Sequence, residues 1–569
     1  MHIVLERSAT GRVEASVVEG DGRVRPAGDF RVEDLPGFVR DREDDRPRWV
    51  WDDTRSWYPE LLRAGVRVAR CVDLRLSHAI LRLSTLSAAS DLALAPPGPW
   101  DGPVLAHDDA GTPARAALFD LEDEVDEASD SGGIAGAAAG AAPITELRAQ
   151  LDAVAGSSDP RRLRLLLAAE SAGALIAAEM RHAGLPYSAE RHEELLSALL
   201  GPRPRFGRPA VLEALLAEVR AALQSPELNP DSPPDLLRAL RRAGIMATST
   251  RSWELKKVEH PAIAPLLQYK KLSRLLTANG WSWLDTWVHD GRLRPDYVPG
   301  GVVTGRWATR GGGALQLPRQ VRGAVVADPG WKLVVADAAQ LEPRILTGLA
   351  QDGAMAEAGR GKDLYAGIVA SGAVDERAQA KVAMLGAMYG ATTGESGRLM
   401  PRLTRAFPRA VRLVEEAARA GERGESVTSR LGRSSPRPGG SWRETQSAAS
   451  AAESTAMEER RARSQARDWG RFTRNFVVQA SAAEWALCWM AELRNRLTAF
   501  APDGELTAAP HLVYFLHDEV IVHTPAGLAD AVADAVAVSA AQAGRLLFGG
   551  FPVEFRVTTA IVDSYAEAK

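Results

Sequence analysis

The sequence has few of the features that mark secreted, membrane or disulfide-stabilised proteins. Its two cysteines, Cys71 and Cys488, stand far apart in apolar surroundings, so we predict neither a disulfide framework nor a thiolate metal site. We find no apolar run that reads as a membrane span, and residues 1–11 lack the long apolar core of a signal peptide. We therefore expect a cytoplasmic protein with no membrane partner.

The chain also lacks a strong excess of either charge. Its 69 Lys and Arg against 73 Asp and Glu give a net charge of −4, so any nucleic-acid surface must be local. Hydrophobic residues make up 46% and charged residues 25%, as in ordinary globular proteins. With 569 residues the chain is too long for one hydrophobic core, and we expect three or four subdomains.

Hydrophobic patterning divides the chain into segments. The N-terminal 120 residues mix strand patterns, as in residues 2–7 and 48–53, with helix patterns, as in residues 56–65 and 74–83. An acidic stretch rich in Gly, Ala and Ser follows and reads as a linker, because it cannot bury enough apolar surface to order itself. Helical periodicity then dominates up to residue 290 and again from 352 to 425. A long helix is expected from Arg471, and a last strand is expected over residues 552–562.

Two strand-like stretches carry acidic residues at their ends. The apolar run from Lys332 to Ala336 ends on Asp337, and His517, Asp518 and Glu519 interrupt residues 512–524 as at the tip of a hairpin. A carboxylate at the end of a buried strand is costly unless something satisfies it, and a metal ion does so well. Together the acids could hold the pair of Mg²⁺ ions used in phosphoryl transfer. A hydrogen-bonded strand end and a polar turn are the plain alternatives.

A helical segment at residues 374–394 places two cations and an aromatic ring on one stripe. Arg377, Lys381, Leu385 and Tyr389 are spaced four residues apart, and Gly390 is a typical helix stop. This pattern fits a clamp for a triphosphate, with permanent positive charge and a flat group beside it. Surface cations above a core Leu and Tyr give the same pattern.

At this point the chain resembles a known family. From Thr304 onward it is similar to the polymerase domain of family A DNA polymerases, the bacterial DNA polymerase I type. The resemblance rests on five motifs in the order of that family: TGRWAT from Thr304, DAAQLEPR from Asp337, RAQAKVAMLGAMYG from Arg377, RNFVVQ from Arg474, and LHDEV from Leu516.

The resemblance implies an α+β multidomain fold: an N-terminal α/β, RNase H-like domain, then a right-hand polymerase with helical thumb, antiparallel β palm and helical fingers. It also implies boundaries, and no 5′-nuclease domain is expected. The implied parts are a degenerate 3′–5′ exonuclease-like domain at 1–120, a flexible linker at 120–145, a helical connection and thumb at 146–290, the first part of the palm at 291–350, fingers at 351–470, and the second part of the palm at 471–569.

The function implied is template-directed addition of dNTPs to a primer 3′-hydroxyl, in DNA replication or repair. Asp337, Asp518 and Glu519 would be catalytic. The two aspartates and the carbonyl of Ala338 would bind two Mg²⁺ ions, with Mn²⁺ possible in their place. The expected partners are primer–template DNA and dNTPs, and the expected state is a nucleoid-associated bacterial monomer.

The resemblance also assigns binding roles. Glu342 would lie beneath the sugar and select deoxyribose, and Leu385 stands where the family usually has an aromatic residue. The implied nucleotide-binding residues are Gln340, Glu342, Arg377, Lys381, Leu385, Tyr389 and His517. The implied DNA-binding residues are Arg306, Arg471, Asn475 and Gln479, although an ordinary turn and a solvated helix face remain open for these.

The N-terminal domain departs from the acid pattern of a proofreading exonuclease. We find no early D-x-E and no late Y-x3-D, and only Asp52, Asp53 and Asp73 remain. We therefore expect an inactive exonuclease fold. The alternatives are active proofreading, a metal-dependent nuclease that uses the palm acids with water, and a DNA-binding relic without catalysis.

Overall fold

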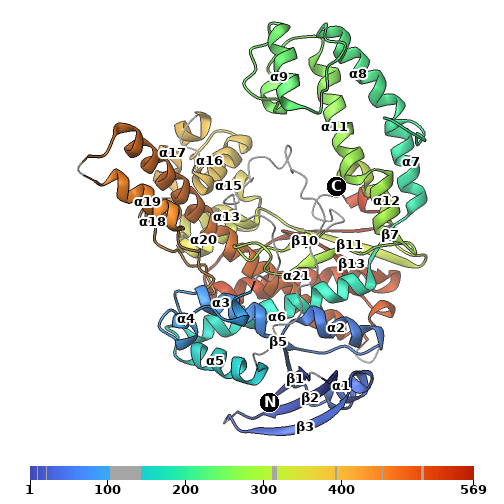
Figure 1. Cartoon of the computed structure of the whole chain (residues 1–569), viewed down its shortest axis with the longest axis vertical. Helices are drawn as coiled ribbons and strands as arrows, with labels where there is room; N and C mark the ends of the chain where they lie inside the picture. The colour runs from blue at the N-terminus through green and yellow to red at the C-terminus, as the bar shows by residue number, and fades with distance from the viewer. Residues whose placement is uncertain are drawn as a thin grey trace.

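The structure is a computed structural model, and Figure 1 shows its separate parts. It describes residues 1–8, 10–20, 22–102, 142–310, 317–390, 394–451, 453–501 and 505–568. The expected linker therefore lies outside the described residues up to residue 141. The fold is a mixed helix and strand, multidomain architecture, as predicted.

The N-terminal domain is built on a five-stranded mixed sheet. Strands β1 (His2–Arg7), β2 (Arg12–Val18) and β3 (Val24–Arg31) are antiparallel, and β4 (Arg48–Trp51) and β5 (Cys71–Asp73) extend the sheet parallel to β1. The order β3-β2-β1-β4-β5 is the α/β arrangement expected of an RNase H-like domain. Fully buried Trp49 and Trp51 fill the sheet's core. The accompanying helices are α1 (Leu35–Glu43), α2 (Thr54–Arg63), α3 (Leu74–Leu83), α4 (Asp91–Leu94) and α5 (Pro143–Ala155).

A central helix, α6 (Pro160–Ala183), joins this domain to the rest of the chain. Asp159 caps its first turn, Pro160 occupies its first position, and it ends at Gly184. Beyond it, a helical arm rises away from the body of the molecule (Figure 1). The arm consists of α7 (Ala189–Leu200), α8 (Ala210–Ala222), α9 (Pro233–Arg242), α10 (Ser252–Leu255), α11 (Ile263–Asn279) and α12 (Trp281–Trp287). Its outer part has a small core of its own, in which Val219, Leu240 and Leu266 are buried.

The palm is a four-stranded antiparallel sheet. Its order is β12 (His511–Leu516), β13 (Glu519–Pro525), β11 (Trp331–Ala338) and β14 (Val557–Val562). Two short ribbons lie nearby in the chain: β9 (Asp296–Val298) pairs with β10 (Ala308–Arg310), and β8 (Arg292–Leu293) pairs with β6 (Leu185–Pro186) and β7 (Val288–His289). The last strand is shorter than residues 552–562, over which the sequence pattern predicted it.

The remaining helices form the fingers and the frame behind the palm. They are α13 (Leu341–Ala350), α14 (Gly353–Gly359), α15 (Leu364–Ala370), α16 (Arg377–Tyr389), α17 (Gly394–Ala406), α18 (Pro408–Glu422), α19 (Gly440–Ala449), α20 (Ala456–Thr498) and α21 (Ala529–Phe548). Figure 1 shows α15 to α19 facing the thumb arm across the molecule.

The predicted start of helix α20 was wrong. We expected it at Arg471, but the helix begins at Ala456, where Thr455 and Glu458 form a reciprocal capping box. The first part of this helix buries only Ala462 and Gly470, so it carries no apolar periodicity for a sequence pattern to detect.

The prediction that no apolar run is long enough to span a membrane was wrong by length and composition. Among the described residues, Ala526–Phe548 is long and apolar enough to cross a membrane by length and composition alone. In the fold, α21 packs against α20 and the strand β11, with Val532, Val536 and Ala540 fully buried. This burial is typical of a core helix.

Candidate active site

The palm sheet brings the two predicted aspartates to the same place. Asp337, near the end of β11, is paired in register with Glu519 at the start of β13. Asp518 lies in the tight turn between β12 and β13, and its carbonyl oxygen accepts a hydrogen bond of 2.8 Å from the Ala338 N–H. Two segments that are distant in the sequence thus meet at one edge of the sheet, as the hairpin pattern predicted.

The donors at this edge suit a hard divalent cation. Asp337 and Asp518 are both partly exposed, and the carbonyl of Ala338 belongs to the same strand end. Among the described residues, no group of three or more His, Cys, Asp or Glu side chains could hold a metal ion. The two carboxylates suit an ion such as Mg²⁺ because they are oxygen donors, and Mg²⁺ takes one or two protein carboxylates and leaves its other positions to water and substrate phosphates.

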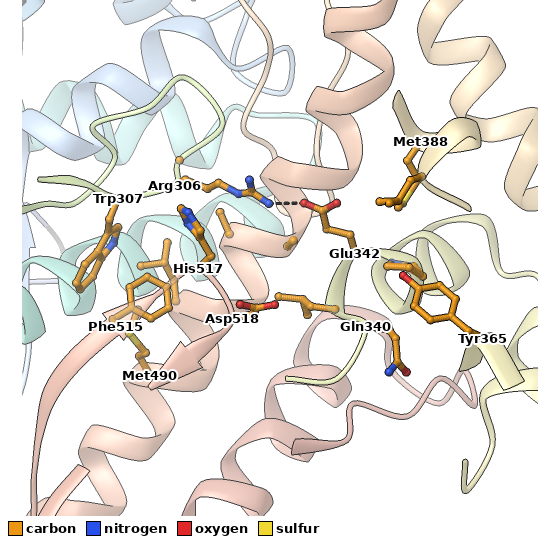
Figure 2. A pocket seen from close by; sticks show the side chains of 17 residues that line it. Arg306, Trp307, Gln340, Glu342, Tyr365, Met388, Met490, Phe515, His517 and Asp518 are labelled. Carbon is orange, nitrogen blue, oxygen red and sulfur yellow. Dashed lines mark hydrogen bonds and ion pairs between the residues drawn. The ribbon is translucent and has the colours of Figure 1, made fainter. Parts of the chain in front are cut away.

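A cavity of about 180 Å³ opens beside Asp518. It lies among the β12–β13 turn, the start of α13, the helix α16 and the middle of α20 (Figure 2). Among the predicted residues, the lining includes Arg306, Gln340, Glu342, Leu385, His517 and Asp518. The structure therefore brings these predicted side chains together around one space.

Glu342 is held from two sides of this cavity. Arg306 forms an ion pair with Oε1 of Glu342, and the Tyr389 hydroxyl donates to Oε2. Figure 2 shows Arg306 and Glu342 pointing toward each other, with His517 and Asp518 beside them. Both partners come from other segments, so the position of the Glu342 carboxylate is fixed by the fold.

His517 stands at the tip of the hairpin in the left-handed region, with φ of 54°. Burial, together with the nearby Arg306 charge, lowers its pKa to about 4. The imidazole is therefore neutral at neutral pH, and it can both donate and accept a hydrogen bond.

The cations of α16 lie toward the same region. Arg377 donates to the Asp363 carboxylate at 2.8 Å and stacks over the Tyr365 ring at 5.5 Å. Asp363 also accepts a hydrogen bond of 3.0 Å from Gln340. Lys381 is exposed one turn further along α16. The sequence pattern did not identify Asp363, whose role depends on the packing of α15 beside α16.

The helix α20 contributes buried polar groups and one residue that stays outside. Asn475 and Gln479 are buried, and Oδ1 of Asn475 has no hydrogen-bond partner within the described part of the chain. Arg471 is exposed and pairs with Asp468 on its own helix. All three residues lie on α20, and the burial of Asn475 and Gln479 shows that they are not part of a solvated helix face.

Glu519 is 2% exposed and accepts a hydrogen bond from the hydroxyl of Tyr565. The guanidinium of Arg322 lies 4.4 Å from the centre of the Tyr565 ring. The sequence pattern did not identify Tyr565, because nothing in its local pattern indicates that its hydroxyl reaches the buried Glu519.

Comparison with known proteins agrees with this geometry. The model of "DNA polymerase family A" matches residues 211–567. The chain belongs to this family. The match begins within the thumb arm, so it covers the palm, the fingers and every predicted site residue.

Relatives of family A share modest identity with the chain. DNA polymerase I of Thermus aquaticus is 24% identical over 424 residues, which are 69% of this chain and 44% of that protein. DNA polymerase I of Thermus filiformis is 26% identical over 315 residues, 50% of this chain and 34% of that protein. The chain thus spans less than half the length of these curated relatives.

A solved structure has the same fold. It is the polymerase domain of Pol1 from M. smegmatis in complex with DNA primer–template and dNTP. The TM-score is 0.65 at 19% identity, and the alignment covers 100% of this chain and 95% of that one. The N-terminal domain, which the family match leaves out, is therefore part of the shared fold.

The acids of the N-terminal domain serve its own helices. Asp73, which is 2% exposed, accepts from the Leu76 N–H at 3.0 Å and from the Thr54 N–H and hydroxyl at 2.8 and 2.7 Å. Burial, with the nearby Asp53, raises the pKa of Asp73 to about 7. Asp53 caps α2, and Asp52 accepts from the Trp57 indole at 2.6 Å.

Proposed function

We propose that this chain is a template-directed DNA polymerase that adds deoxynucleotides to the 3′-hydroxyl of a primer, in DNA replication or repair. The observation that carries the proposal is the meeting of Asp337 and Asp518 at one edge of the palm sheet, beside the cavity that α16 helps to line. The solved relative that holds primer–template and dNTP supports the same partners here.

Divalent ions, Mg²⁺ or Mn²⁺, are the cofactor that these aspartates and the Ala338 carbonyl would hold. Bound there, they would lower the pKa of the primer hydroxyl and neutralise the charge on the leaving pyrophosphate. We assign Glu519 to support of this edge, because it is buried behind Asp337 and held by Tyr565.

The cations of α16 would bind the triphosphate. Arg377 is held by Asp363 in this structure, so a nucleotide must compete with a carboxylate for the guanidinium. Three phosphates carry more charge than one carboxylate, and Lys381 adds a second cation one turn away. Gln340 donates to the same carboxylate of Asp363 as Arg377 does. A movement of Asp363 would therefore break or keep both hydrogen bonds together.

The cavity wall would select the sugar. Glu342 is fixed by Arg306 and Tyr389, so it cannot easily move away from a 2′-hydroxyl placed against it. Neutral His517 would contact the nucleotide or primer end without adding charge. Asn475 and Gln479 would donate from their side-chain amides to the minor-groove edge of the terminal base pair, where acceptor positions are similar for all pairs. Arg306 and Arg471 complete the DNA contacts that we propose.

Primer extension tests this proposal directly. Purified protein with Mg²⁺ and a primer–template should add the dNTP that the template specifies, and should add the matching rNTP far less well. Asp337→Ala serves as the inactive control. Shortening of the primer would instead indicate a nuclease, and binding without extension would indicate a relic. We expect a monomer that works at the bacterial nucleoid in the cytoplasm.

We also propose that the N-terminal domain does not proofread. The domain's remaining acids are occupied as helix caps and hydrogen-bond acceptors, and Asp73 is kept from water. Purified protein with Mg²⁺ should leave a mismatched 3′ end intact over a time in which it extends a matched end. Degradation that disappears on changing Asp52 or Asp73 would show instead that the domain is an active exonuclease.

A further inference from the structure

A second cavity lies away from the catalytic one. Its volume is about 540 Å³, a size that suits a small-molecule ligand. It is bounded by residues 46–48 and 69–71 of the N-terminal domain, by α6, by the last part of α20 and by Leu546 on α21. None of its lining residues lines the catalytic cavity.

Four arginines line this cavity: Arg46, Arg48, Arg70 and Arg494. Arg494 is committed elsewhere, because it is buried and pairs with Glu179 at 2.7 Å. Glu492 is the only carboxylate among the described lining residues, and it pairs with Arg496 at 2.7 Å. The cavity therefore has an excess of positive charge.

The other three arginines have no carboxylate within ion-pair distance in the part of the chain that the structure describes. Arg70 donates to the carbonyl of Arg46 through Nε at 3.1 Å and through Nη2, which places these two residues side by side and leaves Nη1 of Arg70 for a ligand. Burial, and then the charge of Arg70, lowers the pKa of Arg48. Burial first, then the charged N-terminus and the charges of Arg48 and Arg70, lower the pKa of neighbouring His2 to about 4. Burial and a neighbouring positive charge disfavour the charged form of the guanidinium, and an anion bound beside it would stabilise that form.

The other lining residues are mostly small and apolar. Ala168, Ala169 and Ala172 come from α6, and Ala491 comes from α20, with Leu165 beside them. Small side chains leave room against the helix backbones, so a flat organic group can lie against these residues while its charged end reaches the arginines.

We propose that this cavity binds a small phosphate-bearing molecule, a nucleoside phosphate, with the phosphate on Arg48 and Arg70 and the base or sugar against the alanine wall of α6. Arginine suits this ligand because its fork of donors matches phosphate oxygens. The site is independent of the polymerase site, since the two share no residue.

Calorimetric titration of the full chain in EDTA tests the proposal. The ligands are dAMP, deoxyadenosine and inorganic phosphate, and dAMP should bind most tightly because only it carries both parts. Arg48→Ala/Arg70→Ala should weaken dAMP binding by at least about tenfold, because two charge-assisted contacts are lost. Arg161→Ala, which removes an exposed charge elsewhere on α6, should not change it. Binding of phosphate and dAMP alike would assign the site to free phosphate.

One further variant locates the ligand. Arg377→Ala should leave dAMP binding unchanged, because that residue belongs to the polymerase site. Arg70→Gln, at an exposed position, replaces the double variant should the latter fail to fold. Equal affinity of the parent and the arginine variants, or loss of binding in Arg377→Ala, would overturn the proposal. Primer extension by the arginine variants should equal that of the parent chain.

Discussion

At the scale of single residues, the site combines side chains whose types the sequence pattern identified with partners that it did not. The pattern of acids and cations indicated Asp337, Asp518 and Arg377, because each lies on a recognisable strand end or helix stripe. It did not indicate Asp363 or Tyr565, because their contacts cross between elements. A hydrogen-bond partner that depends on tertiary packing has no periodic signal in the sequence.

Leu385 lines the catalytic cavity where family A usually has an aromatic residue, so the wall is smaller and less flat than usual. Leu385→Phe should lower the apparent KM for dNTP by about threefold to tenfold, because a ring adds contact area and stacking. Leu385→Ala should raise it. Steady-state primer extension at varied dNTP concentration measures both, and an unchanged KM in both variants would show that Leu385 does not contact the nucleotide.

Tyr565 donates to the buried carboxylate of Glu519, which is paired in register with Asp337. In Tyr565→Phe this buried charge loses a donor, at a cost of about 1–3 kcal/mol. We expect kcat of primer extension to fall by about tenfold with little change in the dNTP KM. Tyr187→Phe, whose hydroxyl bonds with His192 at the base of the thumb, is the matched control. Equal loss of kcat in both variants would point to a general effect on stability.

At the scale of elements, helices and strands with strong local sequence patterns were predicted correctly, and those with weak patterns were not. The hairpin at His517 and Asp518 and the helix α16 with its stop at Gly390 formed as expected, since turn residues and apolar spacing agree there. The start of α20 was missed because its first turns bury few side chains and so show no apolar periodicity. The shortened β14 shows the converse: residues 552–556 carry apolar residues but belong to no strand. Pairing, which the sequence does not display, decides where a strand begins.

Strands β12 and β13 carry a buried histidine pair, His511 and His523, whose rings lie 5.5 Å apart. Burial lowers the pKa of His511 from 6.5 to about 4 and also lowers that of His523. Between these values the unfolded chain binds more protons than the folded one, so stability falls as the pH drops from about 6.5 to 4. Each histidine contributes up to about 1.4 kcal/mol per pH unit.

The variant His511→Gln should therefore lose less stability than the parent chain between pH 7 and pH 5. The measurement is the urea midpoint at the two pH values, and the difference between them is compared across variants. His289→Gln, at an exposed position, should keep the parental difference. The same difference in all three proteins would show that His511 does not titrate with folding.

At the scale of the whole molecule, the N-terminal domain is fixed to the palm by a buried ion pair. Arg494 of α20 pairs with Glu179 of α6 at 2.7 Å and donates to the carbonyls of Val68 and Ala69 at 2.7 and 3.0 Å. The hydroxyl of Tyr58 donates to the same glutamate at 2.6 Å. Three parts of the chain thus share one charged network, which a sequence pattern could not reveal because its members lie in three separate segments.

Removing one member of this network should loosen the domain. Arg494→Leu leaves Glu179 buried without its main counter-charge, and we expect a loss of about 3–5 kcal/mol in stability. Arg496→Ala, which breaks the partly exposed pair with Glu492 two residues along α20, should cost less than about 1 kcal/mol. Thermal unfolding, together with the rate at which protease releases the N-terminal domain, measures both. Equal effects of the two variants would contradict this role for Arg494.

The most direct test is single-nucleotide incorporation by the variants Asp337→Asn and Asp518→Asn. The control is Asp563→Asn, which removes an exposed carboxylate that pairs with Lys332 on the same strand as Asp337. Each aspartate variant should fold, bind primer–template DNA and yet incorporate nucleotide at least about a thousandfold more slowly, because a lost ligand removes several kcal/mol of metal-derived stabilisation. The control should incorporate at the parental rate. Incorporation at the parental rate by either Asp337→Asn or Asp518→Asn would contradict the central claim, that these two carboxylates together hold the ions of nucleotide addition.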